Sequence, residues 1–182
     1  GFADLLIGAD QNDTTGSNSG RAYVYSGANG ALLRTYEAET PADAFGGGIA
    51  NAGDLDWDGF NDHLVGAPNA GASNGGRAYL YSGRTGSALL LPFVPVPAAV
   101  EFGRFFVAGV GDVDRDGFND LYAGDFAENG GSGRAYVFSG RNGATLRSLP
   151  GPAGSGAGCG RGAGDVDLDG HADLVVGRYT SS

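Results

Sequence analysis

The chain of 182 residues contains no lysine and no methionine, and it has one cysteine, one tryptophan and two histidines. Without methionine, residue 1 is not a retained initiator, so either processing removed a leader or the chain is a section of a longer protein. The single cysteine, Cys159, excludes an intrachain disulfide. We expect it to be a small buried residue, with covalent pairing to another chain as the alternative. One thiol and two histidines do not assemble convincingly into a Ser-His-Asp or Cys-His catalytic constellation, so we expect no enzyme activity.

Long apolar runs and basic stripes are absent as well. No apolar run reaches the length of about 18 residues that a membrane span requires, so we expect none. The arginines form no stripe that would neutralise phosphates, which argues against nucleic acid as a partner. Glycine, in contrast, is abundant: the chain has 36. This excess predicts many tight turns and close backbone approaches, as in an all-β repeat protein.

Most of the acidic charge lies in three loops that share one pattern, Asp-x-Asp-x-Asp-Gly-x-x-Asp, over residues 54–62, 112–120 and 165–173. Carboxylates this close together repel one another strongly unless a cation lies between them. Oxygen-only ligands on a loop bent at a glycine favour a hard cation, and calcium above magnesium. The alternative is an ordinary Asp-rich turn, and three copies argue against it.

The loops also explain the net charge. They contain 12 of the 21 acidic residues of a chain whose formal charge is −10. Three calcium ions would bring that charge to about −4. The acidity therefore indicates metal sites more than an acidic partner surface.

The place of each residue in the pattern predicts its role. The four aspartates supply side-chain oxygens, the glycine takes the bend, and the residue after it supplies a backbone carbonyl. The predicted calcium ligands are Asp54, Asp56, Asp58, Phe60 and Asp62; Asp112, Asp114, Asp116, Phe118 and Asp120; and Asp165, Asp167, Asp169, His171 and Asp173. Near the start of the chain, Asp4 aligns with Asp62, so we expect a half site there.

An EF-hand calcium loop begins in the same way but needs a bidentate glutamate at position 12 between two helices. Position 12 is occupied here by Val65, Ala123 and Val176, and the flanking segments have the pattern of strands. The sequence therefore excludes an EF-hand.

A second signature, Gly-Arg-Ala-Tyr followed by an apolar pair and Ser-Gly, recurs over residues 20–27, 76–83 and 133–140. Its arginines are 56 and 57 residues apart, and the first aspartates of the loops are 58 and 53 residues apart. A repeat of this length indicates stacked supersecondary units, none of which buries its apolar face alone.

The sequence pattern predicts four short strands in each repeat. In the second period these are residues 45–52, 63–67, 77–81 and 88–93. No segment shows a sustained helical period, so helices should be few or absent. Four antiparallel strands per repeat make the blade of a β-propeller. We therefore expect an all-β fold with two complete and two partial blades, and with the calcium loops between the first and second strands of each blade.

The expected blade limits are approximately residues 1–40 (partial), 41–97, 98–150 and 151–182 (partial) within one segment. Two complete blades are too few to close a ring, so the segment should belong to a larger or oligomeric propeller. Open blade edges favour self-association. The last unit departs from the pattern: Gly156 stands where Phe45 stands in the second unit, and residues 156–164 lack a phenylalanine and a β-branched residue. We expect its first strand to be irregular or poorly packed.

The repeats also carry a family resemblance. The residues in question are Phe45-Gly46, Gly53-Asp54 and Gly66-Ala67-Pro68, with a looser second copy at Phe102-Gly103, Gly111-Asp112 and Ala123-Gly124. They resemble the FG-GAP repeat of the integrin alpha-subunit propeller. The resemblance extends over essentially the whole chain. It implies that the Asp loop joins the inner two strands of a blade and holds calcium on the lower rim of the propeller.

Several other side chains have both a structural and a functional interpretation. Packing between blades is the default for Tyr23, Tyr25, Tyr79, Tyr81 and Tyr136, with a sugar-stacking platform as the alternative. The recurring Arg21, Arg77 and Arg134 are better explained by structural pairing with a carboxylate or carbonyl than by ligand binding. We expect His63 and His171 to be solvent-facing loop residues, and Trp57 to be an exposed contact for a partner.

Our leading hypothesis is a non-catalytic, calcium-binding propeller segment of an extracellular or cell-surface protein that serves adhesion, binding or assembly. Its partners would be protein or glycan ligands. The alternatives are a carbohydrate-binding lectin, an accessory propeller of a secreted hydrolase or lyase whose catalytic residues lie elsewhere, and a subunit of a self-assembling surface fibre.

Overall fold

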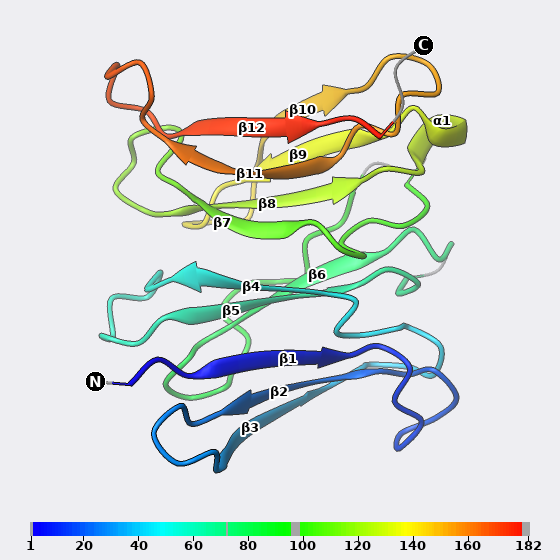
Figure 1. The fold of residues 1–182 in the computed structure, drawn as a ribbon, viewed down its shortest axis with the longest axis vertical. Helices are drawn as coiled ribbons and strands as arrows, with labels where there is room; N and C mark the ends of the chain where they lie inside the picture. The colour runs from blue at the N-terminus through cyan, green and yellow to red at the C-terminus, as the bar shows by residue number, and fades with distance from the viewer. Residues whose placement is uncertain (1, 72, 96–98, 180–182) are drawn as a thin grey trace.

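The computed structural model describes residues 2–71, 73–95 and 99–179, and it is built almost entirely from antiparallel β-sheet (Figure 1). The sheets have the strand orders β1-β2-β3, β4-β5-β6, β10-β9-β8-β7 and β11-β12. The strands are β1 (Leu5–Ala9), β2 (Arg21–Tyr25), β3 (Leu32–Glu37), β4 (Gly48–Gly53), β5 (Asp62–Ala67), β6 (Arg77–Tyr81), β7 (Val107–Gly111), β8 (Asp120–Asp125), β9 (Arg134–Phe138), β10 (Thr145–Pro150), β11 (Cys159–Gly164) and β12 (Asp173–Gly177). The expected all-β class is confirmed.

Helix is almost absent from the described residues. The single element α1 (Glu128–Gly131) is one turn long, and Asn129 and Gly130 within it have left-handed backbone angles. Within the described ranges, no helix is long and apolar enough to cross a membrane.

The four sheets follow one another in chain order along the long axis of the molecule (Figure 1). The strands β1, β4, β7 and β11 form the line of contact between neighbouring sheets, since β1 contacts β4, β4 contacts β7, and β7 contacts β11. This arrangement is that of successive propeller blades, partial at both ends, in an open rather than a closed array.

The fourth strand predicted at residues 88–93 does not form a continuous ladder. Only two isolated bridges join this segment to β6, Ala78 with Phe93 and Tyr81 with Ala88. Between the bridges the segment has two residues more than β6, and these excess residues leave Leu91 87% exposed. Pro92 beside it has no N–H to donate to a ladder. The segment therefore follows β6 as a bulged edge, whereas its counterpart β10 forms a continuous ladder with β9 that has one register shift, between Thr145 and Arg147.

The sequence predicts that the first strand of the last unit is irregular or poorly packed. Irregularity is wrong, whereas poorer packing agrees with its burial, since Arg161, Gly162 and Gly164 of β11 are exposed and no residue of β7 is. β11 pairs with β12 from Cys159 to Gly164, with a register shift before the loop like those in the β4–β5 and β7–β8 pairs. Backbone hydrogen bonds hold this ladder. The glycines of β11 have no side chains, and this leaves space for the Tyr122 ring of β8. A Cβ on Gly160 would lie 2.4 Å from Cζ of Tyr122, whose ring is fully buried. The position of Phe45 is taken by Ala157, because both residues form the same parallel bridge to the preceding unit.

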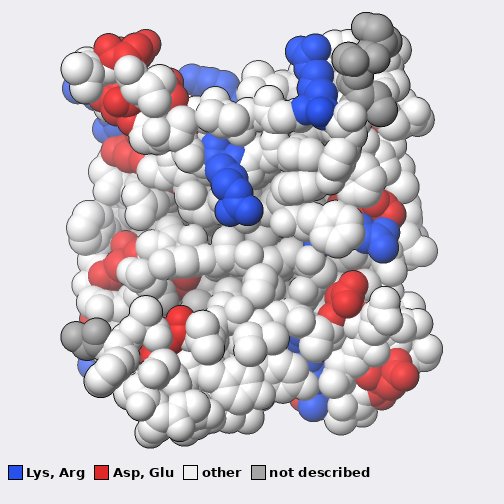
Figure 2. Space-filling model, viewed as in Figure 1, with Lys and Arg blue, Asp and Glu red and all other residues white. Residues whose placement is uncertain are grey.

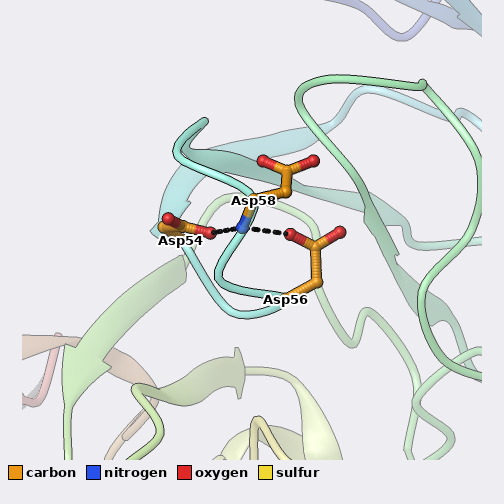
Figure 3. Close-up of side chains that lie close together, drawn as sticks. All are labelled: Asp54, Asp56 and Asp58. Atoms are coloured by element: carbon orange, nitrogen blue, oxygen red, sulfur yellow. Dashed lines mark hydrogen bonds between the residues drawn. The ribbon is translucent and has the colours of Figure 1, made fainter.

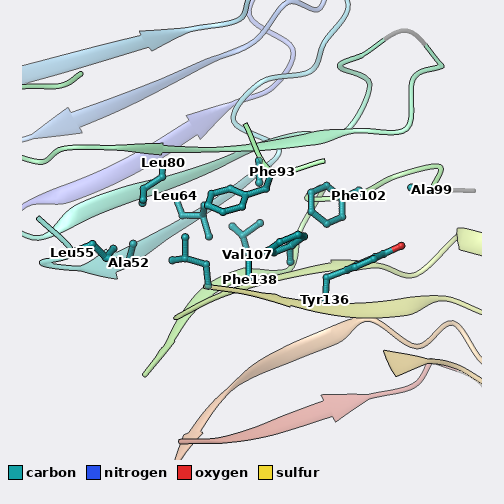
Figure 4. Close-up of a cluster of buried hydrophobic side chains, with 13 residues drawn as sticks. Ala52, Leu55, Leu64, Leu80, Phe93, Ala99, Phe102, Val107, Tyr136 and Phe138 are labelled. Atoms are coloured by element: carbon teal, nitrogen blue, oxygen red, sulfur yellow. The ribbon is translucent and has the colours of Figure 1, made fainter. Parts of the chain in front are cut away.

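Apolar side chains fill the space between consecutive sheets. Figure 4 shows the cluster between the second and third sheets, where Phe102 lies against Tyr136 and Phe138 with ring centroids 5.4 and 5.9 Å apart. Phe45 contacts Tyr79 in the same way one unit earlier, at 5.5 Å. The phenylalanine of the Phe-Gly motif therefore meets the aromatic residues of the Gly-Arg-Ala-Tyr signature in the core. Packing between blades, expected for the tyrosines, is confirmed for Tyr79 and Tyr136.

One glycine in the second strand of each blade allows the next unit to approach closely. A Cβ on Gly66 would lie 1.9 Å from the carbonyl oxygen of Gly103, and a Cβ on Gly124 would lie 1.8 Å from that of Gly158. Gly8 has the same relation to Gly46, at 2.1 Å. No side chain fits at such distances, so these positions require glycine for backbone packing.

The fit between Gly160 and Tyr122 can be tested by a double-mutant cycle. We expect Gly160→Ala to lower the free energy of unfolding by about 1–3 kcal/mol, because the added methyl group overlaps the Tyr122 ring. In a Tyr122→Leu background the same substitution should cost at least about 1 kcal/mol less. Urea unfolding of the four proteins measures both values. An equal cost in the two backgrounds would contradict the proposed contact.

Candidate metal centre

The three Asp-rich loops lie on one side of the molecule, on the left in Figure 1, where they connect β4 to β5, β7 to β8 and β11 to β12. Acidic side chains follow the same side in the space-filling view (Figure 2). The prediction that each loop joins the first and second strands of its unit is confirmed. Since each unit has the same topology, the three loops share one rim.

Within the first loop, the carboxylates are held by backbone amides of the loop itself (Figure 3). Asp54 accepts hydrogen bonds from the amides of Asp58 and Gly59, at 3.0 and 2.9 Å. Asp56 accepts from the amide of Asp58 at 3.2 Å, and Asp58 accepts from that of Phe60 at 2.9 Å. These bonds wrap the chain around the carboxylates, so oxygens of Asp54, Asp56 and Asp58 lie within 4.8 Å of one another.

The second and third loops repeat this hydrogen-bond pattern. Asp112 accepts from Asp116 and Gly117 at 3.1 and 2.9 Å, and Asp165 accepts from Asp169 and Gly170 at the same two distances. Here the carboxylates that lie within 4.8 Å come from the first, third and ninth positions: Asp112, Asp114 and Asp120, and Asp165, Asp167 and Asp173. Each loop therefore brings at least three carboxylates into the range of one cation.

All three loops place a residue other than glycine in the left-handed backbone region at position 4. Trp57, Arg115 and Leu168 have φ angles of 60°, 64° and 62°. This conformation costs roughly 1 kcal/mol for a side chain without a compensating local hydrogen bond. Two positions later, Gly59 has φ of 90°, a value that suits glycine. The loops thus combine like-charge crowding with backbone strain.

The ninth-position aspartates have a structural role that the sequence did not reveal. Asp62 is fully buried, and it accepts hydrogen bonds from the amides of Leu55 and Gly83 at 2.7 and 3.0 Å. Asp120 does the same with Val113 and Gly140, at 2.8 and 3.2 Å. Each carboxylate therefore ties its loop to the Ser-Gly turn that follows the third strand of the same blade.

Burial has a further effect on these two carboxyl groups. It raises the pKa of Asp62 and of Asp120, and the hydrogen bonds from the backbone amides oppose that rise. Neighbouring loop aspartates raise both pKa values further. Near the start of the chain, Asp4 accepts from the amide of Gly27 at 3.0 Å, which supports its alignment with Asp62.

Neighbouring loops contact one another along the rim. Trp57 of the first loop, which is 69% exposed, meets the Phe118 ring of the second loop edge to face, with centroids 6.0 Å apart. In the third loop, His171 Nδ1 lies 2.7 Å from the carbonyl oxygen of Val113, and the Ala172 amide donates to the Asp112 carbonyl at 2.9 Å. Each loop therefore contacts the next, through side-chain rings between the first two and through the backbone of the second between the last two.

Both histidines differ from the expectation that they face solvent. His63 lies in β5 rather than in the loop, is half-buried, and has Nδ1 2.9 Å from the Tyr36 hydroxyl. Burial lowers the pKa of His63, and the Arg34 guanidinium lowers it further. His171 is also half-buried through its contact with Val113. The alternation of β5 points His63 at the preceding sheet, and the loop pattern alone does not predict that.

The recurring arginines are paired with glutamates, as expected for a structural role. Arg21 pairs with Glu37, Arg77 with Glu39 at 2.6 Å, and Arg134 with Glu128 at 2.5 Å. Glu128, which we did not single out from the sequence, is fully buried and also accepts a hydrogen bond from the Tyr136 hydroxyl. No repeat of Glu128 exists in the other units to mark it, so only the fold reveals its importance. Cys159 is half-buried, less than expected.

The structural role of the ninth position can be separated from metal binding by comparing two substitutions in a chelator. We expect Asp120→Ala to destabilise the protein by about 1–3 kcal/mol for each of the two amides left without an acceptor. Asp114→Ala, which removes an exposed carboxylate from the same loop, should cost far less and relieves repulsion. Urea unfolding provides both free energies. Equal costs would show that the buried hydrogen bonds do not matter.

Two comparisons with known proteins agree with this geometry. Residues 45–81 match the family described as FG-GAP repeat, and residues 112–176 match the family described as FG-GAP-like repeat. The first match contains the whole Asp54–Asp62 loop, and the second contains both later loops.

Among curated proteins, integrin alpha-8 of Gallus gallus is 30% identical over 163 residues, which is 82% of this chain and 15% of that protein. Integrin alpha-IIb of Mus musculus is 36% identical over 169 residues, 82% of this chain and 16% of that protein. Integrin alpha-4 of Xenopus laevis is 32% identical over 145 residues, which is 76% of this chain and 14% of that protein. The chain thus spans about one seventh of the length of these relatives. Together, the repeats, the blade topology and these matches identify the chain as a member of the FG-GAP repeat family, a segment similar to the repeats of integrin alpha subunits.

Proposed function

We propose that this chain is a non-catalytic, calcium-stabilised propeller segment of an extracellular or cell-surface protein that serves adhesion. The observation that carries the proposal is that three loops in one rim each bring three carboxylates within 4.8 Å of one another and repeat the same backbone hydrogen bonds. A single acidic turn would be ordinary, whereas three acidic clusters with the same hydrogen-bond pattern favour a common ligand.

The donor set suits calcium. It consists of hard oxygen ligands only, on loops that are exposed enough to admit an ion, and calcium tolerates irregular coordination geometry. The ligands that we propose are the side chains of positions 1, 3, 5 and 9 and the backbone carbonyl of position 7, as predicted from the sequence. Both oxygens of Asp62 and Asp120 already accept an amide hydrogen, and the remaining lone pairs of each carboxylate remain for a cation.

Calcium would act here as a structural ion. In its absence, the loops hold several like charges within a few ångströms and a strained residue at position 4. An ion that binds this ordered arrangement and not the unfolded chain stabilises the fold. Because the loops contact one another along the rim, ion binding would order the whole edge of the blades.

The adhesive role and the location rest on the similarity to integrin alpha subunits, over a segment that covers a small part of their length. We propose a protein ligand as the partner. Two features support a non-catalytic role. The side chains of His63 and His171 are engaged with Tyr36 and with a backbone carbonyl rather than with a nucleophile. The loop carboxylates, once bound to calcium, are poor acids and bases.

Removing calcium should lower the thermal stability markedly. We expect a chelator to reduce Tm by several degrees for each site that empties, since each degree corresponds to a fraction of a kcal/mol in a domain of this size. Differential scanning calorimetry in calcium and in chelator makes the comparison. Magnesium at the same concentration should restore less of the loss, and an unchanged melt would overturn the structural role of calcium.

Each loop should account for one bound ion. Isothermal titration calorimetry on the chelated protein should give three calcium ions per chain, and Asp56→Asn, Asp114→Asn or Asp167→Asn should each weaken one of them by about tenfold or more. Asp10→Asn changes the net charge equally but lies outside the loops, so it serves as the control. A uniform weakening in all four variants would indicate diffuse charge rather than defined sites.

A further inference from the structure

Neighbouring Asp-rich loops touch through the same positions in both places where two of them meet. The residue at position 8 of the later loop lies against the glycine that precedes the earlier loop. A Cβ on Gly53 would lie 2.2 Å from Nδ2 of Asn119, and a Cβ on Gly111 would lie 2.9 Å from Cβ of Ala172. Both glycines therefore let the following loop approach closely. We call each of these contacts a loop junction.

The residue at position 4 makes a second contact in each loop junction. The Trp57 ring of the first loop meets the Phe118 ring of the second. The Arg115 guanidinium of the second loop lies over Gly170 of the third, where a Cβ would be 3.2 Å from its Cζ. Trp57 and Arg115 both have left-handed backbone angles, which a side chain avoids when its loop is disordered. Ordering of one loop therefore directs this side chain at the next loop.

The junction between the second and third loops also contains bonds to the backbone. The Ala172 amide donates to the Asp112 carbonyl at 2.9 Å, and His171 Nδ1 lies 2.7 Å from the carbonyl oxygen of Val113. Asp112 is the proposed ligand at position 1 of the second loop. Asp173, which follows Ala172 in the chain, is the proposed ligand at position 9 of the third. An ion that fixes Asp173 therefore also fixes a hydrogen-bond partner of Asp112.

The charges of the loops act in the opposite direction. Each empty loop carries four carboxylates, and a calcium ion cancels half of that charge, so a filled loop attracts an ion to its neighbour less than an empty loop does. Salt at about 0.15 M screens such exposed charges over about 8 Å. Hydrogen bonds and packing contacts do not weaken in this way. At this ionic strength and above, the contacts of the junction should therefore determine the sign of the coupling.

We propose that calcium binding to the second and third loops is positively cooperative, because an ion in either loop orders the junction that the other loop also uses. The second ion then meets a loop that is already partly ordered, and it loses less conformational entropy on binding. The coupling is reciprocal, and we expect about fivefold in affinity. This cooperativity presupposes calcium binding by the loops, as proposed above.

Three variants of the full chain separate the two sites in isothermal titration calorimetry. Asp56→Asn weakens the first site and leaves the other two. Adding Asp167→Asn leaves the second site alone, and adding Asp114→Asn in its place leaves the third site alone. We expect the product of the two association constants of Asp56→Asn to exceed the product of the two single-site constants by about fivefold. Independent sites give equal products.

A contact variant tests the cause of the coupling. His171→Ala, measured in the same three backgrounds, should remove most of the fivefold factor, because the bond to the Val113 carbonyl is lost. His63→Ala is the matched control. It also removes a half-buried histidine, but one that lies in β5 against Tyr36, so the factor should remain. Arg115→Ala replaces His171→Ala if the melting temperature shows that His171→Ala is not folded.

The outcomes separate this proposal from that of calcium binding itself. Normal binding with equal products, a factor that disappears in about 0.5 M salt, or an equal loss in His63→Ala would overturn the cooperativity and leave the calcium sites standing. A titration without binding in Asp56→Asn would overturn both.

Discussion

The packing of each sheet on the next is the interaction on which the rest of this molecule depends. A sheet of two to four short strands has too little apolar surface to be stable alone, and the largest buried side chains here lie between sheets. Two devices make the contact close. Glycines such as Gly66 and Gly124 let the backbone of the next unit approach, and aromatic rings such as Phe102 fill what remains.

The same packing positions the candidate metal rim. Because every unit repeats the turn from its first to its second strand, the three acidic loops face the same side and touch their neighbours. The ninth aspartate of a loop then has two tasks. It supplies an oxygen near the other carboxylates, and it ties the loop to the turn after the third strand. Loop and blade therefore order each other, which is why a structural ion in the loop would stabilise the sheet.

The sequence predicted well where a local rule determines the outcome. Alternating strands, the placement of the Asp loops between first and second strands, the near absence of helix and the exposure of Trp57 follow from pattern and turn chemistry. The predictions from sequence were wrong where residues far apart in the chain determine the local structure. The glycine-rich β11 forms a ladder and packs against the Tyr122 ring, His63 faces the preceding sheet, and excess residues break the ladder predicted at residues 88–93.

The sequence by itself determined the repeat, the all-β class and the chemistry of the loops, because these depend on residues close together in the chain. The tertiary structure alone decided which face of each strand is covered and which remains open. It also paired Arg134 with the buried Glu128 and set the order of the blades along the long axis. These features depend on contacts between whole sheets, where one side chain's burial is set by the neighbour that packs upon it, and no local pattern encodes that neighbour.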